Sequence, residues 1–413
     1  MLIGNRPRKI IEFFIKLEIE LNKKSLIMAL VVTLPAIAQA QGAVTLYGVI
    51  DEGINYQSNA GGKALYNLSS GVIQGSRWGL KGREDLGGGN AAVFVLENGF
   101  DVNTGALGQG GRMFGRQAFV GLSSNTYGML TLGRQYDSVV TSLGEFAVGD
   151  QWGGYITAHP GDLDNFNNTI RTNNAIKYAS VSYGGFSFSG TYALGGVAGS
   201  LTGNQVWAVG ANYARGPVRL GAAYLNARTP NAGFFSNSSS AAVTPATVAL
   251  SSPVTSGFVS AHSYSVAAAA GSYTFGNATL GVTYSNIRYA DLGDLSTGAN
   301  PHGYSGNAVF NDVEANASYQ LTPALLLGAA YNYTNGGSVL SATGKKPSAT
   351  YHQVSLGADY FLSKRTDLYI IGLYQKASGV DSRDVTAVAA VNLLTPSSNN
   401  HMAVVRIGMR HKF

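Results

Sequence analysis

Cysteine, charged side chains and long apolar runs are absent or scarce in this chain of 413 residues. The lack of cysteine excludes disulfides and thiolate metal sites. Charged residues make up 12% of the sequence, well below the roughly 25% that is usual for soluble domains. Beyond the first 40 residues, no stretch reaches the roughly 20 consecutive apolar residues of a membrane-spanning helix. Little charge, no spanning helix and abundant glycine and tyrosine indicate strands with a surface that faces something other than water.

The charge balance gives no indication of a nucleic-acid partner. The whole chain has a formal charge of +6, and removing the first 40 residues lowers it to +3. No basic tract of the kind that binds nucleic acid occurs in the remainder. Histidines are few and scattered, without the spacing of metal ligands, so we expect neither a metal site nor another cofactor.

Residues 1–40 have the features of an export signal. Asn22–Lys24 supplies the positive end, Leu26–Ile37 the apolar core, and Ala38–Ala40 an A-x-A cleavage site. A single membrane anchor is the alternative, but the apolar core is too short for it. The preface before Asn22 is long for a signal, and we hypothesise that the true start lies near Leu21. Cleavage after Ala40 leaves residues 41–413, which we expect to form one domain.

The rest of the chain alternates between apolar and polar residues. In the last segment, Val405, Ile407 and Met409 fall on one face, and Arg406 and Arg410 on the other. We count about sixteen such segments of roughly ten residues, separated by short turns and longer loops, which is the pattern of a transmembrane antiparallel β-barrel. Lipid offers no partner for backbone groups, so a spanning sheet has to close. The competing folds, a β-sandwich or a β-propeller, would carry more charge, and no blade repeat is present.

Two long segments break the alternation. Gln135–Ile170 contains five acidic residues and no Lys or Arg, together with aliphatic and aromatic side chains that have to be buried. A loop of this length in a compact domain is usually functional. Asn226–Ala261 is rich in Ser, Ala, Thr and Pro, and we interpret it as a flexible surface loop.

Several stretches of the chain resemble a known family. They are VTLYGVIDEGI, SRWGLKGREDLGGGNAAVFVLENGF, RQAFVGLSSNTYGMLTLGRQYD, RTNNAIKY and the terminal HKF. Together they are similar to the Gram-negative general porins of the β-proteobacterial type, of the Neisseria and Burkholderia kinds. The resemblance implies a sixteen-stranded barrel without enzymatic activity, passing ions and small hydrophilic solutes by passive diffusion. It also implies an outer-membrane homotrimer in contact with lipid and lipopolysaccharide, a third outer loop that folds inward to narrow the pore, and a terminal Phe413 that signals to the barrel assembly machinery.

The same resemblance assigns basic residues to the wall of the constriction. Arg77, Arg116 and Arg171 match the basic cluster of related porins, and Lys81, Arg134 and Lys177 are further candidates. Alternation puts Arg77, Arg171, Lys81 and Lys177 on the polar face, and for these four simple solvation of the lumen is the alternative. Arg116 has the strand parity of the lipid-facing Val120 and Leu122, so it reaches the lumen only if a bulge occurs or the strand begins after it. By the same parity, Arg134 either contributes to the wall or only ends its strand.

Acidic residues complete the expected constriction. Asp137, Glu145 and Asp150 are the candidate acids of the loop, with Asp137 and Glu145 favoured for exposure to the pore. Asp162 and Asp164 are expected to face water at the loop's exit. Other expected lumen residues are Glu97, Arg406 and Arg410, with Glu97 pairing with the basic cluster. Whether anions or cations are preferred is left open, because the strand bases and the loop acids act in opposite directions.

Three alternatives to a general porin remain at this point. A substrate-specific porin would show saturable block by one solute. An outer-membrane barrel enzyme would need a nucleophile and a base, for which no local motif is present. A structural or adhesive protein would use Asn226–Ala261 as its contact surface.

Overall fold

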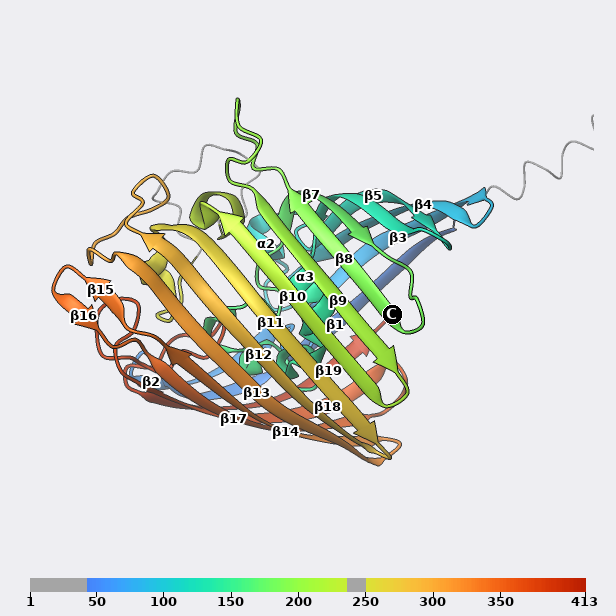
Figure 1. Ribbon diagram of the computed structural model, residues 1–413. Coiled ribbons are helices and arrows are strands. Elements are labelled where there is room, and N and C mark those ends of the chain that lie inside the picture. The colour runs from blue at the N-terminus through green and yellow to red at the C-terminus, as the bar shows by residue number, and fades with distance from the viewer. Residues whose placement is uncertain (1–42, 236–249) are drawn as a thin grey trace, which may run out of the picture.

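The computed structural model describes residues 43–235 and 250–413 and shows a closed antiparallel β-barrel with strongly tilted strands (Figure 1). The predicted signal segment, residues 1–40, lies outside the described residues. The strands of the barrel are β1 (Ala43–Ala60), β2 (Lys63–Ser70), β3 (Arg77–Gly87), β4 (Asn90–Gly99), β5 (Gln117–Ser124), β6 (Gly128–Gln135), β7 (Thr172–Ala179), β8 (Phe186–Ala193), β9 (Val206–Arg215), β10 (Val218–Arg228), β11 (Ala261–Phe275), β12 (Ala278–Leu292), β13 (Gly306–Thr322), β14 (Leu325–Gly336), β17 (Thr350–Phe361), β18 (Thr366–Ser378) and β19 (His401–Lys412).

The remaining elements are short and lie in loops. A two-stranded hairpin, β15 (Val339–Ser341) and β16 (Gly344–Lys346), forms a separate sheet beside the outer end of β13. The helical turns are α2 (Gly108–Gly111), α3 (Ser138–Leu143), η2 (Gly144–Phe146), η3 (Val148–Asp150), η4 (Tyr155–Thr157), η5 (Pro160–Asp162), η6 (Asn231–Phe235) and η7 (Ser256–Phe258). No helix among the described residues is long and apolar enough to cross a membrane.

Both ends of the sheet meet at β1, which pairs with β19 and closes the barrel. β1 also pairs with β2 through its second half and with β3 through its first half. β2 and β3 are therefore one interrupted strand, and the described residues form a sixteen-stranded barrel, as predicted. At the interruption, the Asp51 carboxylate accepts from Gln74 N, and the Ser76 hydroxyl donates to Asp51 O. The Gly, Ser and Asn residues after β1 predict a loop up to about Gly75, and this prediction is wrong in part, because Lys63–Ser70 is a strand.

Side chains alternate between lipid and lumen, as the sequence predicts. On β19, Val405, Ile407 and Met409 are exposed on the outer surface, whereas Arg406 is fully buried on the lumen side. The terminal Phe413 continues the ladder, because its backbone exchanges two hydrogen bonds with Gly48 of β1. Closure of the sheet satisfies the hydrogen bonds of the backbone, and the apolar outer face allows the barrel to contact lipid while the polar inner face contacts water.

The outer half of the lumen contains an aromatic core. Phe234 and Phe235 of η6 and Phe258 of η7 are buried and lie against Tyr264 and Tyr289 of the wall, with ring centroids between 5.1 and 6.2 Å apart. These phenylalanines belong to the segment that the sequence presents as a flexible surface loop, and for its described flanks that interpretation is wrong. Residues 236–249 lie outside the described residues. A low-charge segment can fold inward because its few aromatic side chains find an apolar wall.

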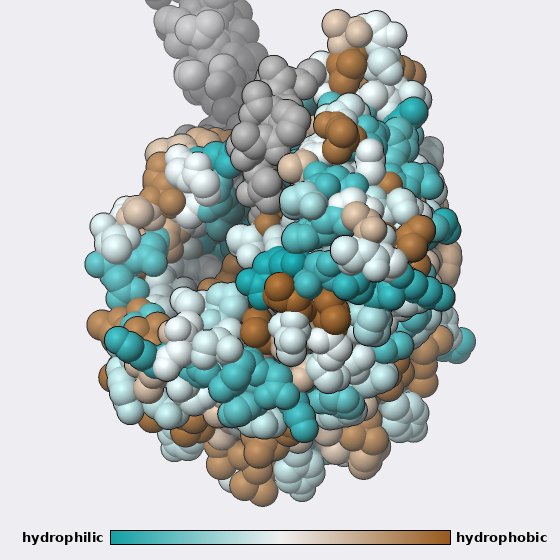
Figure 2. Space-filling model, turned by 90° about the vertical axis from the view of Figure 1, so that its left-hand side faces the viewer, coloured by the Kyte–Doolittle hydropathy of each residue, from teal (hydrophilic) through white to brown (hydrophobic). Residues whose placement is uncertain are grey.

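The barrel opens toward the side of the long loops. Figure 2 views the molecule from that side and shows a hollow bordered in large part by hydrophilic residues. Hydrophobic residues gather along the lower outer margin of the same view, where strands face outward. The mouth and the outer wall thus differ in polarity as expected for a water-filled pore in a membrane.

Candidate functional site

Residues 136–171, between β6 and β7, form the third outer loop, here called L3. L3 begins with α3, and Asp137 caps that helix, because its carboxylate accepts from Val139 N at 2.7 Å and Val140 N at 3.1 Å. Asp137 is fully buried, and burial raises the pKa of its carboxyl group. The prediction that Asp137 faces the pore is therefore wrong. An acid directly before a short helix is an N-cap signal, and the sequence contains it.

After α3, L3 crosses the lumen to the opposite wall. Val148 N donates to Glu314 of β13 at 2.8 Å, and Asn316 donates to Phe146 O at 2.7 Å. Trp152 then packs flat on the wall, where a Cβ on Gly328 would lie 2.2 Å from its ring. Glycine on β14 thus provides the space for the tryptophan. The expectation that the loop's aromatics are buried against the wall is confirmed.

The tip of L3 reaches the interruption between β2 and β3. Tyr155 N donates to Val72 O at 2.9 Å, and Gln353 of β17 donates to Thr157 O at 2.9 Å. The chain then returns across the lumen, and Asn165 donates to the Asp137 carboxylate at 3.0 Å, which closes the base of L3. L3 is held from several directions, so its position inside the barrel is fixed.

A channel of about 1000 Å³ remains between L3 and the barrel wall. L3 contributes both of its limbs to the lining, and the strands contribute residues from β3, β4 and the β8–β10 side. The charged residues that line it are Arg77, Glu97, Asp101, Arg116, Glu145, Asp150, Arg171 and Arg219. This water-accessible gap carries the chemistry of the site.

Three guanidinium groups gather on one side of the channel around one carboxylate. Arg116 Nε lies 2.9 Å from Glu97 Oε1, and Arg77 Nε lies 3.6 Å from Glu97 Oε2. Arg116 also donates to the Tyr136 hydroxyl at 2.9 Å, and Arg171 lies over the Tyr136 ring at 5.9 Å. We call Arg77, Arg116, Arg171 and Glu97 the arginine cluster. The predicted pairing of Glu97 with the basic residues is confirmed.

Arg116 reaches the lumen because β5 begins one residue later, at Gln117. The parity rule that would point it toward lipid applies only inside the strand, so the second of the two explanations offered by the sequence holds. Tyr136 was not singled out from the sequence, although it is the first residue of L3. Its hydroxyl accepts from Arg116 and donates to Glu97 at 3.2 Å, so it bridges the two side chains.

Two acids of L3 face the channel, as predicted, and one of them has a partner that the sequence analysis missed. Glu145 forms a half-exposed ion pair with Arg219 of β10. Asp150 is exposed and lines the channel. The sequence did not indicate that Arg219 faces the lumen, because its strand neighbours on the same face, Gly221 and Ala223, give no polar pattern.

The other basic candidates are not among the described residues that line this channel. Lys81 is exposed, with its ammonium group 5.3 Å from the centre of the Tyr47 ring. Arg134 donates to Gly115 O at 2.8 Å and to Asn173. Lys177 is buried beneath L3 and donates to Tyr136 O at 2.8 Å and to Thr141. Arg134 and Lys177 therefore fix neighbouring segments.

Arg406 and Arg410 lie on the lumen side, as predicted, and both are neutralised locally. Arg406 is fully buried and lies 3.1 Å from Asp51. Arg410 lies 2.9 Å from Asp367 and 3.4 Å from Asp359. These pairs join neighbouring strands near the closure of the barrel.

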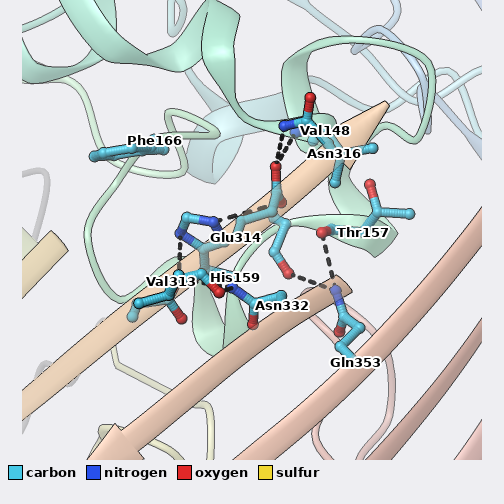
Figure 3. A network of polar contacts seen from close by, with 12 residues as sticks. Val148, Thr157, His159, Phe166, Val313, Glu314, Asn316, Asn332 and Gln353 are labelled. Atoms are coloured by element: carbon cyan, nitrogen blue, oxygen red, sulfur yellow. Dashed lines mark hydrogen bonds and ion pairs between the residues drawn. The ribbon is translucent and has the colours of Figure 1, made fainter. Parts of the chain in front are cut away.

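A second charged cluster holds the returning limb of L3 against β13 (Figure 3). His159 Nδ1 lies 2.7 Å from Asp164 and 3.3 Å from Asp312, and His159 Nε2 lies 3.5 Å from Glu314. We call these four residues the histidine cluster. All are buried, and the expectation that Asp164 faces water is wrong. The same holds for Asp162, where burial and the nearby Asp164 raise the pKa to about 6.

Sequence reasoning missed the histidine cluster, because its members come from two segments about 150 residues apart. Burial alone lowers the pKa of His159, but the carboxylates of Asp164 and Asp312 outweigh burial, and the pKa lies well above its usual value. Burial raises the pKa of Asp164, but the His159 charge outweighs it and leaves that pKa below its usual value. The described geometry places one imidazole among three carboxylates.

Comparison with known proteins decides the family. A model of the Gram-negative porin family matches residues 26–379. The chain belongs to this family. It is an outer-membrane porin of the β-proteobacterial type, and its barrel encloses a water-filled channel, as the resemblance implied.

Relatives and solved porins agree with this assignment. An outer membrane porin protein of Bordetella pertussis is 32% identical over 392 residues, which cover 86% of this chain and 94% of the relative. The structure of an anion-selective porin from Comamonas acidovorans has a TM-score of 0.66 at 22% identity and covers 90% of this chain and 100% of that one. A trimer form of OmpT from Vibrio cholerae has a TM-score of 0.59 at 16% identity and covers 90% of this chain and 99% of that one.

Proposed function

We propose that L3 and the arginine cluster form the selective constriction of a general diffusion porin. The observation that carries this proposal is that the arginine cluster and two acids of L3, Glu145 and Asp150, line the same channel. Opposed charges in a narrow aqueous gap create a field across the pore, which orients dipolar solutes. The channel selects small hydrophilic solutes by size and by this field.

The arginine cluster carries a local excess of positive charge, although the described lining as a whole has four arginines (Arg77, Arg116, Arg171, Arg219) and four acids (Glu97, Asp101, Glu145, Asp150). The arginine cluster has three guanidinium groups and one carboxylate, Glu97, which pairs with Arg77 and Arg116. On the L3 side, Glu145 is already paired with Arg219, so Asp150 is left to oppose the excess. We infer a modest preference for anions from this local excess, and the similar fold of the anion-selective porin from Comamonas acidovorans supports it.

The working form of the protein that we propose is a homotrimer without catalytic activity. Support comes from the trimer form in which the Vibrio porin was solved and from the porin names of the relatives. A general porin conducts in proportion to solute concentration. Saturable block by a single sugar or organic anion would instead favour a substrate-specific porin.

The reversal potential in a salt gradient tests the constriction. In planar bilayers, Arg77→Ala and Arg171→Ala should each shift it toward cation preference, because each removes one lining cation. Lys81→Ala is the matched control, since it removes an exposed cation that is not among the described lining residues. Equal reversal potentials for wild type, both arginine variants and the control would contradict the proposal.

A further inference from the structure

His159 has an unusual position in the barrel, because it is the single cation for three buried carboxylates. In the described part of the chain, the ion pairs of Asp164, Asp312 and Glu314 are all with His159. Each residue of the histidine cluster is at most 2% exposed. Carboxylates removed from water require compensation nearby, since the desolvation cost of each amounts to several kcal/mol.

Neutral donors stabilise the same carboxylates but cannot balance their charge. Asp164 accepts from the Ser285 hydroxyl at 2.6 Å and from Phe166 N at 3.3 Å. Asn332 donates to Asp312 at 2.6 Å, and the Thr334 hydroxyl donates to the other oxygen of Asp312. These bonds supply no positive charge, and His159 is the one side chain among the four residues of the histidine cluster that can carry it.

A metal ion fits this geometry less well than a proton. Ligand-type atoms of His159, Asp164 and Asp312 lie within 4.8 Å of one another. Zinc bonds of about 2.0–2.2 Å in a tetrahedral site would place two ligand atoms roughly 3.3 Å apart. The Nδ1 to Asp164 separation of 2.7 Å is shorter and corresponds to a charged hydrogen bond. Nε2 points to the other side of the ring, toward Glu314.

The histidine cluster connects directly to the pore. The Phe166 ring lies 5.5 Å from the His159 ring, and Phe166, Asn167 and Asn168 line the channel. Asp164 also holds Phe166 N, so a single carboxylate touches both the imidazole and the pore-lining limb. Glu314 holds the outgoing limb at Val148 N. Both limbs of L3 therefore meet the wall at this cluster.

We propose that His159 is a positioning residue for L3, which clamps both limbs to β13 as an imidazolium and so keeps the pore at a constant width. This inference rests on the proposed role of L3 as the constriction. Without the positive charge, the three carboxylates repel one another and the limbs separate from the wall. L3 then fluctuates in the lumen, and the channel becomes noisy and closes more readily under voltage.

The pH dependence of the clamp has a defined sign. The pKa of His159 in the folded protein lies above its ordinary value, so the clamp is complete below that ordinary value of about 6.5 and is lost as the pH rises through the raised value. The titratable groups that face His159 or its direct partners are Asp162 and Asp164 of L3, Asp312 and Glu314 of β13, Tyr264 of β11 and Tyr289 of β12.

His159→Gln tests the clamp in single-channel recordings, because glutamine keeps a polar side chain but carries no charge. The closed fraction at a fixed voltage should rise about tenfold, which corresponds to about 1.4 kcal/mol. His262→Gln is the matched control. His262 also lies 2.7 Å from a carboxylate, that of Asp294, but the pair is partly exposed at the outer end of β11. His159→Gln recordings that match the control would overturn the proposal.

A variant that also lacks two of the three carboxylates distinguishes the clamp from a general packing effect. His159→Gln combined with Asp164→Asn and Glu314→Gln removes the cation and two carboxylates together, and it should recover much of the quiet wild-type behaviour. A triple variant that is as noisy as the single one would contradict a role for charge. Channel noise of the wild type should increase between neutral and strongly alkaline pH, and the control His262→Gln should show the same increase.

The pH series also serves if His159→Gln does not assemble, since a wild-type channel that stays equally quiet at alkaline pH would overturn the clamp. A chelator or added Zn²⁺ should leave the channel noise of the wild type unchanged at neutral pH. A response to either would mean that a metal ion, not a proton, supplies the positive charge of the histidine cluster.

Arg77→Ala separates this inference from the constriction itself. If Arg77→Ala shifts the reversal potential but His159→Gln channels are quiet, only the clamp is rejected. If Arg77→Ala does not shift the reversal potential, the constriction itself is rejected.

Discussion

The arginine cluster and the histidine cluster both gather like charges around a single counter-charge, but they differ in their contact with water. The arginine cluster is largely buried as well, with Glu97 4% and Arg171 8% exposed, but its four residues line a channel of about 1000 Å³, whereas the histidine cluster lies between L3 and β13 and is not among the described residues that line the channel. Water screens the excess charge of the first, which is available to passing ions. The second has no such screening, so its charges act on one another and hold the chain in place. Access to water therefore separates charges that act in transport from charges that fix the structure.

Removing Glu97 should give the largest effect, because it takes the single carboxylate out of the arginine cluster. Glu97→Ala leaves Arg116, whose side chain is 11% exposed, without its ion-pair partner. The loss of such a partner costs roughly 3–5 kcal/mol, measured as a lower midpoint of thermal unfolding in detergent. The reversal potential should move toward anions at the same time. Glu84→Ala removes an exposed acid of β3 and serves as control.

Raising the pH should destabilise the histidine cluster more than the arginine cluster. The raised pKa of His159 means that stability is lost as the pH increases through that value. Thermal unfolding of the wild type should therefore show a falling midpoint at alkaline pH, and His159→Gln should show a smaller slope. Equal slopes for the two proteins would show that His159 is not the titrating group.

Asp137→Ala should lower stability moderately and leave selectivity unchanged. The loss of an N-cap costs about 0.5–2 kcal/mol, and the buried carboxylate of Asp137 is not among the described groups that line the channel. Asp150→Ala is the contrasting variant, because it removes an acid that does line the channel. It should shift the reversal potential toward anions with little change in the unfolding midpoint.

Glu145→Gln should have the smallest effect on stability. The ion pair with Arg219 is about half exposed, and pairs of this kind contribute about 0–1 kcal/mol. The substitution frees the Arg219 charge, so a small shift of the reversal potential toward anions is expected. A large fall in the unfolding midpoint would mean that Glu145 supports L3 as the histidine cluster does.

Much of the barrel could be predicted from the sequence, because side chains alternate with a period of two and one face contacts lipid. The position of L3 was also recognisable, since acids and aromatics replace the alternation there. Arg77 and Arg171 lie on the channel wall where parity and the family resemblance placed them. The local sequence pattern is sufficient to predict which way a side chain points wherever this depends on one strand alone.

The sequence failed where distant segments share one environment. Asp164 looks like a solvated loop acid, and only the approach of β13 makes it part of a buried cluster. His159 gives no ligand spacing because two of its three partners, Asp312 and Glu314, lie on β13. Phe234 and Phe258 flank a segment of low complexity, and their burial depends on tyrosines from β11 and β12. Strand parity also fails for Arg116, which stands one residue outside its strand.

The aromatic core inside the outer lumen has a further consequence for the size of the pore. Strand number fixes the circumference of a barrel, but part of the enclosed cross-section in this protein is solid. The open area therefore depends on how much of the interior the loops occupy, and it can change by substitutions in η6 and η7 while every strand is kept. Permeability and membrane insertion are in this way encoded in different parts of the chain and can vary independently.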